Sequence, residues 1–577
     1  MHVVATAGHV DHGKSTLVRA LTGMEPDRLE EERRRGLSIQ LGYVWTRLPG
    51  LPDDDEVAFV DVPGHERFVA TMLAGVGPVP AVLFVVAADD PWMPQAAEHL
   101  AALDALGVRH GVLVVTRSDL ADPAPAMARA RHELDATSLA GCPGVAVSGR
   151  TGAGMDDLRE ALVPVLAAVP SPDPASDVRL WVDRRFHVRG AGTVVTGTLP
   201  AGTVRVGETL QAGGATVRVR GLECLGSQRD AARGVARVAL DLGGKAPADV
   251  DRGSVLCTPG AFEPTRLVDV RLTRPGSVPE KPLLHIGAAS VGVHARPLGD
   301  DLVRLSLDRP LPLRVHDRAL LRDPGSRGLW GVTVLDPAPP PLRRRGAAAT
   351  RAEELSEADG TLAGELDRRG QVSRSALERR GFTGGPPPGT VGAGDWLLSA
   401  ARARELAEAL TGLAGRRPEG VAVPAAARTL GVPAGLVAPL VRPPLRAENG
   451  RVVTGTASPL PQRLLDAVEA IRSDLADAPF AAPDGNRLRD LGLDRKDLAV
   501  LGAAGRLLRL DDSTVLLPGA DDRATTVLAG LSQPFTVSDA RSALASSRRV
   551  VLPLLAHLDR TGRTLRLPDD RRTLRNA

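Results

Sequence analysis

Apolar residues occur in short runs along the first 165 or so residues, and polar or helix-favouring segments separate these runs. The runs span residues 2–7, 57–62, 81–88, 111–116 and 144–148. Helical patterns over residues 97–106 and 155–166 lie among the intervening segments. Apolar runs that alternate with helices are typical of buried parallel strands. The pattern therefore predicts a doubly wound, mostly parallel α/β domain over residues 1–170.

The chain changes character at about Arg179, where short β-rich segments are broken by Gly and Pro. Residues 190–199, 202–210 and 214–222 are examples. No helical periodicity returns until past Pro341, and this texture is typical of β-barrels. We therefore predict a multidomain fold with one or two β-barrels after the α/β domain, and we assign residues 177–262 and 263–340 to them.

A Pro-rich and then basic segment, residues 336–346, has the composition of a linker, and the chain beyond it is helical with short β signals. Residues 505–512 (GRLLRLDD) and 562–569 (GRTLRLPD) resemble each other, and each follows an apolar, helix-like run. We predict tandem α+β winged-helix units over residues 347–577, with the last unit at about 520–577. The similarity is short, so unrelated small helical bundles stay an alternative.

Composition adds limits to this architecture. A chain of 577 residues is too long for one core, and 43% hydrophobic residues can supply several. Three scattered cysteines (Cys142, Cys224, Cys257) form no metal-ligand pattern. The apolar runs are shorter than a membrane span, and the N-terminus has no secretory pattern. We therefore expect a soluble, cytoplasmic protein without a membrane partner, and a monomer.

The segment "GHVDHGKS" follows the first apolar run and precedes a helix that should begin near Ser15. This is the context of a P-loop, in which glycines turn backbone N–H groups toward phosphate oxygens. Lys14, one of only four lysines in the chain, can reach the phosphates, and the Ser15 hydroxyl can bind Mg²⁺. The predicted phosphate-binding residues are Gly8, Val10, Asp11, His12, Gly13, Lys14, Ser15 and Thr16.

Three further segments follow predicted strands in the order that a nucleotide site requires. "DVPG", Asp61 to Gly64, places a carboxylate where it can hold a Mg²⁺-bound water and a glycine N–H where it can sense the γ-phosphate. "TRSD", Thr116 to Asp119, places an aspartate that can accept hydrogen bonds from guanine. "SGR", Ser148, Gly149 and Arg150, can add backbone contacts to the same base. Ligands of open α/β sheets bind at these strand ends, so the sequence predicts GTP or GDP with Mg²⁺.

"GHVDHGKST" and "DVPGHE" resemble the signatures of translational GTPases. The resemblance implies that His65 positions the hydrolytic water. This chain departs from the family at Thr116 and Arg117, where the family has Asn-Lys, although the Arg117 stem can still stack on the base. It also has Ser38 where the family has the switch threonine, and the hydroxyl that binds Mg²⁺ is kept.

The pattern of a GTPase domain and two barrels resembles elongation factor Tu over about residues 1–340, including "RGAGTVVTGTL" at residues 189–199. The long tail makes the whole chain similar to the bacterial selenocysteine-specific elongation factors. "LGYVW", "VDRRF" and "DRGSVL" sharpen this match, and the resemblance implies that Tyr43, Asp183, Arg184 and Arg252 line a pocket for the selenocysteinyl group. A selenol is anionic at neutral pH and the precursor serine is neutral, so guanidinium groups favour the correct cargo. Singly, such arginines are more often surface charges.

Tyr43 is the only tyrosine of the chain and lies five residues after Ser38. A lone tyrosine on a strand is more often a packed core residue than a ligand contact. Beside Asp183, Arg184 and Arg252 it is instead interpreted as a wall of the pocket.

Arginine is concentrated at the C-terminus, with nine arginines against three aspartates from Arg541 to Ala577. Such an excess is typical of nucleic-acid binding, and a solvated basic terminus is the alternative. In a winged helix, Arg548 and Arg549 would begin the recognition helix, and Arg563 and Arg566 would lie on or near the wing. Pro553 would kink that helix or delay its start. The family resemblance implies that the ligand is the selenocysteine insertion hairpin of the mRNA.

These features together predict a GTP-hydrolysing elongation factor that carries selenocysteinyl-tRNA to the ribosome and binds the mRNA hairpin through its tail. Two alternatives stay open. One is a general aminoacyl-tRNA or initiator-tRNA carrier, which the long tail disfavours. The other is a GTP-switched regulator whose winged helices bind DNA, which the tRNA-type barrels disfavour.

Overall fold

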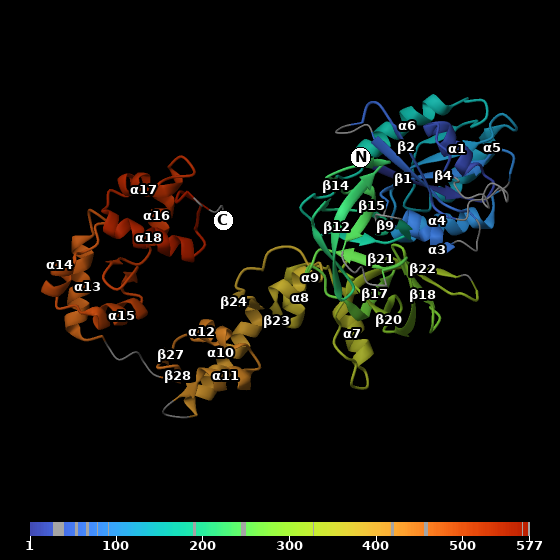
Figure 1. The fold of residues 1–577 in the computed structure, drawn as a ribbon. Coiled ribbons are helices and arrows are strands. Elements are labelled where there is room, and N and C mark those ends of the chain that lie inside the picture. The colour runs from blue at the N-terminus through green and yellow to red at the C-terminus, as the bar shows by residue number, and fades with distance from the viewer. Residues whose placement is uncertain are drawn as a thin grey trace. The chain divides into compact units, whose positions relative to one another are not determined.

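A computed structural model describes residues 1–26, 40–51, 56–64, 69–77, 79–90, 92–188, 192–243, 250–326, 328–416, 420–454, 460–567 and 569–574. Two predicted site residues, Ser38 and His65, lie outside the described residues. The chain divides into two compact units (Figure 1). The first comprises Met1–Leu406 with Val432–Leu440, and the second comprises Ala407–Gly431 with Val441–Ala577.

The N-terminal domain is the predicted α/β sheet, with strand order β2-β3-β1-β4-β5-β6. All neighbours pair in parallel except β2 and β3, which are antiparallel. The strands are β1 (His2–Gly8), β2 (Gly42–Arg47), β3 (Glu56–Asp61), β4 (Ala81–Ala87), β5 (His110–Thr116) and β6 (Gly144–Ala146). The helices are α1 (Lys14–Thr22), α3 (Val69–Val76), α4 (Pro94–Leu106), α5 (Pro123–Leu134) and α6 (Met155–Ala167).

Alternate residues of β1 point to opposite faces of this sheet, as the two-residue period of a strand requires. Val3 and Ala5 pack into a core that also contains residues of α3 and α4. Val4 packs into a second core that contains residues of α1 and α6. Because both faces are covered, the strands are continuous apolar runs, and this is why the sequence pattern identified them.

The first barrel is a curved sheet with strand order β7-β16-β11-β12-β15-β9-β8, and β10 pairs with β14 beside it. Two residues after β7, the Asp183 N–H donates to the Thr196 carbonyl oxygen of β9 at 2.9 Å, so the segment after β7 lies beside β9. The strands are β7 (Arg179–Trp181), β8 (Arg184–Val188), β9 (Gly192–Leu199), β10 (Thr203–Arg205), β11 (Thr209–Ala212), β12 (Ala215–Cys224), β13 (Ser227–Gln228), β14 (Ala231–Arg233), β15 (Ala236–Gly243) and β16 (Val255–Cys257).

The second barrel is closed, with strand order β17-β20-β19-β18-β21-β22. Its strands are β17 (Thr265–Leu272), β18 (Leu283–Ile286), β19 (Ala289–Pro297), β20 (Leu302–Leu311), β21 (Arg318–Arg322) and β22 (Leu329–Asp336). Together with the first barrel it confirms the fold class that the sequence predicted.

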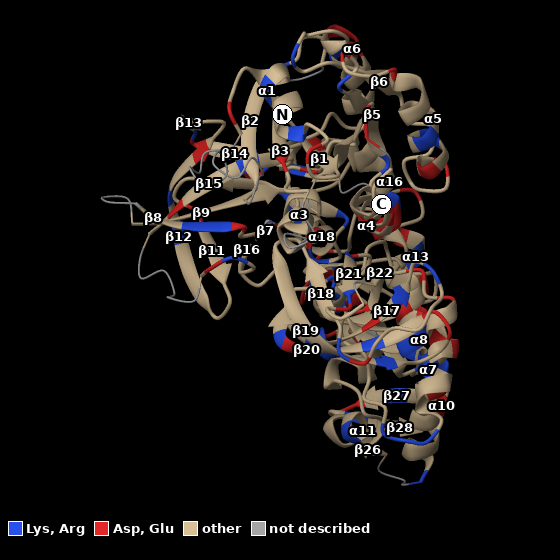
Figure 2. Ribbon diagram, turned by 90° about the vertical axis from the view of Figure 1, so that its right-hand side faces the viewer, with Lys and Arg blue, Asp and Glu red and all other residues tan. Residues whose placement is uncertain are grey.

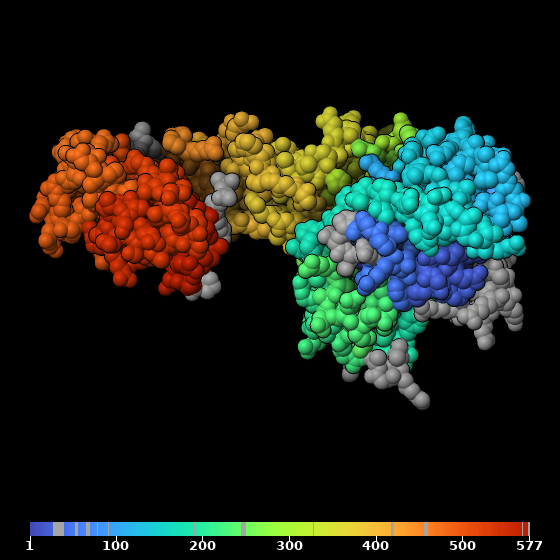
Figure 3. Space-filling model, turned by 90° about the horizontal axis from the view of Figure 1, so that it is seen from above, coloured from blue at the N-terminus to red at the C-terminus, as the bar shows by residue number. Residues whose placement is uncertain are grey.

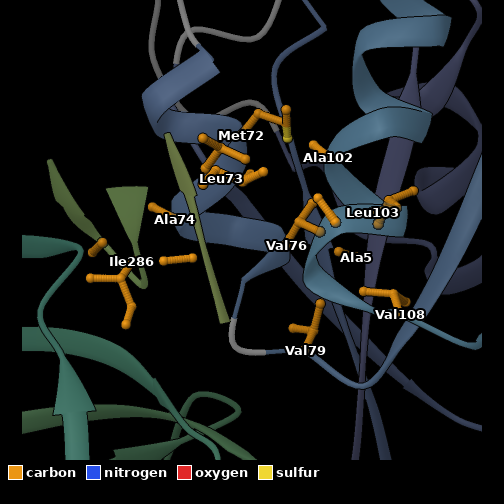
Figure 4. Packing of buried hydrophobic residues seen from close by; sticks show 14 of the residues in the cluster. Ala5, Met72, Leu73, Ala74, Val76, Val79, Ala102, Leu103, Val108 and Ile286 are labelled. Atoms are coloured by element: carbon orange, nitrogen blue, oxygen red, sulfur yellow. The ribbon is translucent and has the colours of Figure 1, made fainter. Parts of the chain in front are cut away.

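Helix α3 lies between the α/β sheet and the second barrel. Figure 4 shows Val76 of this helix beside Leu103 of α4, with Ile286 of β18 beyond Ala74. One hydrophobic core runs through all of these residues and reaches Trp181 of the first barrel. The space-filling view likewise shows the blue and cyan α/β domain directly against the green first barrel (Figure 3). A displacement of α3 would therefore disturb packing in more than one domain.

A small winged-helix unit follows the second barrel. Its elements are α7 (Ala347–Ser356), α8 (Leu362–Arg369), β23 (Gln371–Ser373), α9 (Arg374–Arg379), β24 (Val391–Ala393) and β25 (Trp396–Leu398). The strands form a sheet of order β23-β25-β24. Val315, from a loop of the second barrel, packs into the core of this unit with Leu362 and Phe382.

Buried ion pairs join this unit to the second barrel. Asp269 of β17 and Asp336 of β22 are fully buried and lie opposite each other in adjacent strands. Two carboxylates in this position would repel, so cations must lie between them. Arg351 of α7 supplies one, because it donates to Asp269 at 2.8 Å and also to Asp336. Arg304 forms two hydrogen bonds with Asp269, at 2.7 and 2.9 Å. Figure 2 locates β17 and α7 among the blue and red segments of the ribbon.

Helix α10 (Ala400–Gly415) crosses the division between the two units. The next elements are β26 (Val421–Ala422), α11 (Val423–Leu430), a 3₁₀ turn (Ala434–Leu436), α12 (Val437–Leu440), β27 (Leu445–Glu448) and β28 (Arg451–Thr454). The remaining elements are α13 (Gln462–Asp474), α14 (Gly485–Asp490), α15 (Arg495–Ala503), β29 (Leu508–Arg509), β30 (Val515–Leu516), α16 (Ala520–Ala529), α17 (Val537–Ala543), α18 (Arg548–Arg560), β31 (Thr564–Arg566) and β32 (Arg572–Leu574).

The two similar stretches of the tail occupy equivalent places in this order. The first contains β29 and the second contains β31, and each of these strands follows a helix pair and opens an antiparallel strand pair. Helices α13 to α18 share one hydrophobic core, and Figure 1 shows α16, α17 and α18 packed beside one another. The helix-turn-helix units with a following wing are thereby confirmed, whereas the domain boundaries stay predictions.

Among the described residues, no single helix is long and apolar enough to cross a membrane, and only α11 with the following Ala434–Leu440 reaches that length when joined across a bend. Cys142, Cys224 and Cys257 are free cysteines, and the latter two are buried, as expected of small core residues.

The buried ion pairs generate a stability prediction. Replacing Arg351 with Met leaves Asp269 and Asp336 facing each other with one cation fewer, and this should lower the free energy of unfolding by about 3–5 kcal/mol. Exposed Arg345, six residues earlier, is the matched control, and Arg345→Met should change stability by less than about 0.5 kcal/mol. Urea titrations of the full chain, followed by circular dichroism, measure both. Equal midpoints for the two variants would contradict the prediction.

Candidate functional site

The loop between β1 and α1 needs glycine at two positions. Gly8 has φ of 132°, and a Cβ there would lie 2.1 Å from the Val85 carbonyl oxygen. Gly13 has φ of 79° at the N-cap of α1. Side chains are disfavoured at both places, so the backbone can turn its N–H groups inward at the start of the helix. Val10, Asp11 and Thr16 complete the loop and the first turn, where the sequence placed them.

Lys14 lies in the centre of this loop. Its ammonium donates to the carbonyl oxygens of Gly8 at 3.1 Å and His9 at 2.6 Å. Burial lowers the pKa of Lys14 to about 8, so an anionic ligand would be needed to restore its usual basicity. A Cβ on Gly64 would lie 2.5 Å from Lys14 Nζ, and the "DVPG" segment therefore passes directly over the lysine.

Ser15 and Asp61 meet at the end of β3. The Ser15 hydroxyl donates to Asp61 Oδ2 at 2.6 Å, and the Thr6 hydroxyl donates to Asp61 Oδ1 at 2.8 Å. Thr6 in turn accepts the Val62 N–H at 3.1 Å, so the carboxylate is held from both sides. These hard oxygen donors suit Mg²⁺ beside a phosphate. Within the described ranges, no group of three or more His, Cys, Asp and Glu side chains forms a metal site by itself.

The base-recognition segments come together at the ends of β5 and β6. A hydrogen bond from the Ser148 hydroxyl holds the pKa of Asp119 below its usual range, so this carboxylate stays an acceptor. Arg150 Nε lies 3.6 Å from Asp119 Oδ2. A Cβ on Gly149 would lie 3.1 Å from the Thr16 methyl group, which places the "SGR" segment against α1.

The departures from the family pattern at Thr116 and Arg117 both contact the phosphate loop. The Thr116 hydroxyl donates to the His12 carbonyl oxygen at 2.7 Å. Arg117 donates to Asp89 at 3.1 Å and also to the Asp11 carbonyl oxygen. Both side chains therefore tie the base-recognition segment to the P-loop. Base stacking by Arg117 stays a prediction.

A buried histidine holds the end of β1, and the sequence analysis missed it. The Gly8 N–H donates to His99 Nδ1 at 3.0 Å, from β1 to α4. Burial, and then the charge of Lys14, lower the pKa of His99 to about 3, so the ring is neutral. Burial likewise lowers the pKa of His12 to about 4. A polar residue on the apolar face of the helical pattern at residues 97–106 was the available signal.

Three of the four predicted pocket residues lie together where β2 meets the first barrel. The Tyr43 hydroxyl donates to Asp183 Oδ2 at 3.4 Å. Arg184 donates to the Leu41 carbonyl oxygen, and its guanidinium carbon lies 5.2 Å from the centre of the Tyr43 ring. Arg237, which the sequence analysis missed, lies closer to that ring, at 3.7 Å. The sequence carried no signal for it, because Arg237 alternates with the core residues Ala236 and Val238 and so lies on the outer face of the strand, where a basic residue is ordinary.

The fourth predicted residue, Arg252, contacts α3 in this structure. Its guanidinium donates to the Ala70 carbonyl oxygen at 3.2 Å and to the Thr71 hydroxyl at 3.1 Å. Arg252 therefore links the first barrel to the helix that follows "DVPG". Its place in the pocket stays a prediction.

The four predicted RNA-binding arginines have different surroundings within the last winged helix. Arg548 is exposed at the start of α18, which begins there with Pro553 inside it, so the proline does not delay the helix. Arg549 donates to the Ala482 carbonyl oxygen at 2.7 Å. Arg563 pairs with Asp522 at 2.7 Å, and Arg566 of the wing pairs with Asp570 at 2.5 Å.

Comparisons with known proteins agree with this arrangement. The family described as "Elongation factor Tu GTP binding domain" matches residues 1–168, and the family described as "Elongation factor SelB, winged helix" matches residues 526–573. The selenocysteine-specific elongation factor of Desulfomicrobium baculatum is 35% identical over 407 residues, which cover 66% of this chain and 63% of that protein. Elongation factor Tu 2 of Streptomyces avermitilis is 32% identical over 379 residues, which cover 57% of this chain and 95% of that protein.

A crystal structure of a bacterial selenocysteine-specific elongation factor matches the fold over 100% of both chains, with a TM-score of 0.69 and 24% sequence identity. The aligned part of this chain spans less than two thirds of the D. baculatum protein. The predicted resemblance to the selenocysteine-specific factors is thereby confirmed, and so is the GTP-binding domain.

The His99 contact generates a prediction about pH. The unfolded chain protonates this ring below its ordinary pKa of 6.5, whereas the folded chain keeps it neutral down to about pH 3. The stability that depends on the neutral ring is therefore complete above pH 6.5 and is lost as the pH falls. Between pH 7 and pH 5 this one residue accounts for roughly 2 kcal/mol.

His99→Asn keeps an acceptor near the Nδ1 position and cannot titrate, so the urea midpoint of the variant should fall less between pH 7 and pH 5 than that of the wild type. His132→Asn, at an exposed histidine of α5, should keep the wild-type pH dependence. Urea titrations at both pH values test this. An unchanged pH dependence in His99→Asn would refute the role of the ring.

Proposed function

Because this chain belongs to the family of elongation factor Tu-like translational GTPases, we propose that it carries selenocysteinyl-tRNA to the ribosome in its GTP-bound form. The observation that carries the proposal is the cluster of Tyr43, Asp183 and Arg184 at the edge of the first barrel. A cationic site beside an aromatic wall suits a selenolate, whereas a neutral serine hydroxyl gains little from it.

The nucleotide is proposed to bind as in other P-loop GTPases. Lys14 and the inward N–H groups hold the phosphates, and Asp119 accepts hydrogen bonds from guanine. Ser15 and Ser38 would hold Mg²⁺ through their hydroxyl groups, and Asp61 would hold it through a water. The bound ion would neutralise charge on the phosphates. His65 positions the water that attacks the γ-phosphate when the ribosome is contacted.

A short path joins the nucleotide to the pocket. Asp61, which accepts from Ser15, lies opposite Gly42 in the pairing of β3 with β2. The next residue of β2 is Tyr43, which donates to Asp183. A change around Ser15 can therefore move the pocket wall through one strand pair. We propose that GTP hydrolysis moves Tyr43 through this strand pair, and that the movement of the pocket wall releases the tRNA.

The tail is proposed to bind the selenocysteine insertion hairpin of the mRNA. Arg548, Arg549, Arg563 and Arg566 are the candidate contacts, and exposed Arg548 is the strongest because it opens the helix that would face the RNA. The relatives named for selenocysteine support this assignment over a general or initiator-tRNA carrier. The winged-helix match supports RNA over DNA as the ligand.

Binding of charged tRNA in the presence of a non-hydrolysable GTP analogue tests the proposal. The wild type should bind the selenocysteinyl form more tightly than the seryl form. Arg184→Ala should weaken the selenocysteinyl form by about 10-fold to 100-fold, the value of one charge-assisted hydrogen bond, and the seryl form much less. Arg296→Ala, at an exposed residue of β19, is the control and should leave the ratio of the two affinities unchanged. Equal losses of both forms in Arg184→Ala would refute the pocket.

Filter binding of the full chain to the RNA hairpin tests the tail. Arg548→Ala should weaken binding about threefold to tenfold and lower the slope of log Kd against log salt concentration by about one. Arg404→Ala, at an exposed residue of α10, should change neither quantity. Tighter binding to duplex DNA than to the hairpin would instead favour a DNA-binding regulator.

A further inference from the structure

We propose that Arg237 is a positioning residue of the aminoacyl pocket, which neutralises Asp183 and fixes the Tyr43 ring so that the charge of Arg184 acts on the cargo. This inference rests on the proposed function, since it assigns the residue that sets the charge of that pocket. The observations that carry it are the burial of Arg237, its contacts with Asp183 and its distance from Tyr43.

Arg237 lies on β15, opposite Thr198 of β9, and only 8% of its surface is exposed. Its two terminal nitrogens donate to the two oxygens of Asp183, and one of these hydrogen bonds measures 2.7 Å. Such a bidentate pair fixes the plane of the carboxylate as well as its distance. A buried arginine in this geometry is already committed to its partner and is not available as a surface charge.

Asp183 has no acceptor capacity left for another cation. Besides the two hydrogen bonds from Arg237, it accepts the Thr196 hydroxyl at 2.7 Å and the Tyr43 hydroxyl at 3.4 Å. A carboxylate offers about four lone-pair sites, and all of them are engaged. The charge of Asp183 is therefore satisfied from the barrel side by Arg237.

The Tyr43 ring lies next to both guanidinium groups. The guanidinium carbon of Arg237 is 3.7 Å from the ring centre, and that of Arg184 is 5.2 Å away. Contact with a cation stabilises a ring face, and the closer contact of Arg237 fixes the ring orientation. Burial raises the pKa of the Tyr43 phenol well above its ordinary value, so the phenol keeps its proton and continues to donate to Asp183.

The charges of this cluster explain how the pocket can prefer an anion. Arg237 engages both oxygens of Asp183, so Asp183 does not draw on the guanidinium of Arg184, which lies beside Tyr43. If Arg237 lost its charge, Asp183 would be a buried carboxylate without its ion-pair partner, which is costly. Asp183 would then pair with Arg184, the next residue in the chain. An ion pair between Asp183 and Arg184 would cancel the positive charge that attracts a selenolate.

Arg252 does not take over this role in the present structure. Its guanidinium holds the Ala70 carbonyl oxygen and the Thr71 hydroxyl of α3. Arg237 is therefore the arginine that pairs with Asp183, whereas Arg252 connects the first barrel to α3 by hydrogen bonds.

A charge-compensation experiment tests the proposal. The full chain with a non-hydrolysable GTP analogue is titrated with selenocysteinyl-tRNA and with seryl-tRNA, and the ratio of the two dissociation constants is the readout. Arg237→Met should lower this ratio about 10-fold or more, because Asp183 then claims Arg184. The double variant Asp183→Asn with Arg237→Met removes both charges and should restore the ratio to within about threefold of the wild type.

Arg237→Lys keeps the charge without the bidentate fork and should give an intermediate ratio. A merely structural role for Arg237 predicts equal losses of both tRNA forms and no rescue in the double variant, and that result would overturn the inference. Binding of a fluorescent GTP analogue to each variant checks that the GTP-binding domain is folded. If the wild type does not distinguish the two tRNA forms, the proposed function fails first. If the wild type distinguishes them and Arg237→Met does so equally well, only the inference on Arg237 fails.

Discussion

A carboxylate that is removed from water has to be paired, and this constraint holds the first unit of the protein together. Asp61, Asp183, Asp269 and Asp336 are all buried. Each of them joins segments that are far apart in the sequence: Asp61 joins β3 to the P-loop, Asp183 joins the first barrel to β2, and the last two join the second barrel to α7. Because an unpaired member would cost several kcal/mol, each joint tolerates few alternative arrangements.

The buried carboxylates also fix where the nucleotide site lies relative to the barrels. The nucleotide site and the proposed pocket share the strand pair β2–β3, so the carboxylate beside Ser15 and the phenol beside Asp183 lie on adjacent strands. Helix α3 offers a second connection, since it packs against the second barrel and accepts hydrogen bonds from Arg252 of the first. A well-packed core transmits displacement because it has few voids to absorb it. A structural change at the nucleotide site can therefore reach the barrels in two ways, through the strand pair β2–β3 and through helix α3.

Features that depend on local pattern were predictable from the sequence. The five apolar runs became β1, β3, β4, β5 and β6, because a strand covered on both faces must be apolar throughout. The P-loop was equally predictable, since glycine at Gly8 and Gly13 follows from the backbone that phosphate binding requires. The edge strand β2 and the partners of Arg237, His99 and Arg351 were not predictable. Their roles depend on residues more than 50 positions away or on another domain, and a single arginine on the outer face of a strand carries little signal in a chain so rich in arginine.

The arginines of this chain suit the buried ion pairs that connect its segments. The same physical reasoning explains why the phosphate loop has a lysine, Lys14, instead. A planar guanidinium matches a carboxylate with two parallel hydrogen bonds, as Arg237 does with Asp183, Arg304 with Asp269 and Arg179 with Asp317. A site that must release and rebind its anion needs a compact charge on a flexible stem instead. Lys14 meets this need, because its ammonium rests on two carbonyl oxygens of the loop and can turn to a phosphate without breaking an ion pair. The fixed joints therefore use arginine, and the site through which the nucleotide passes keeps lysine.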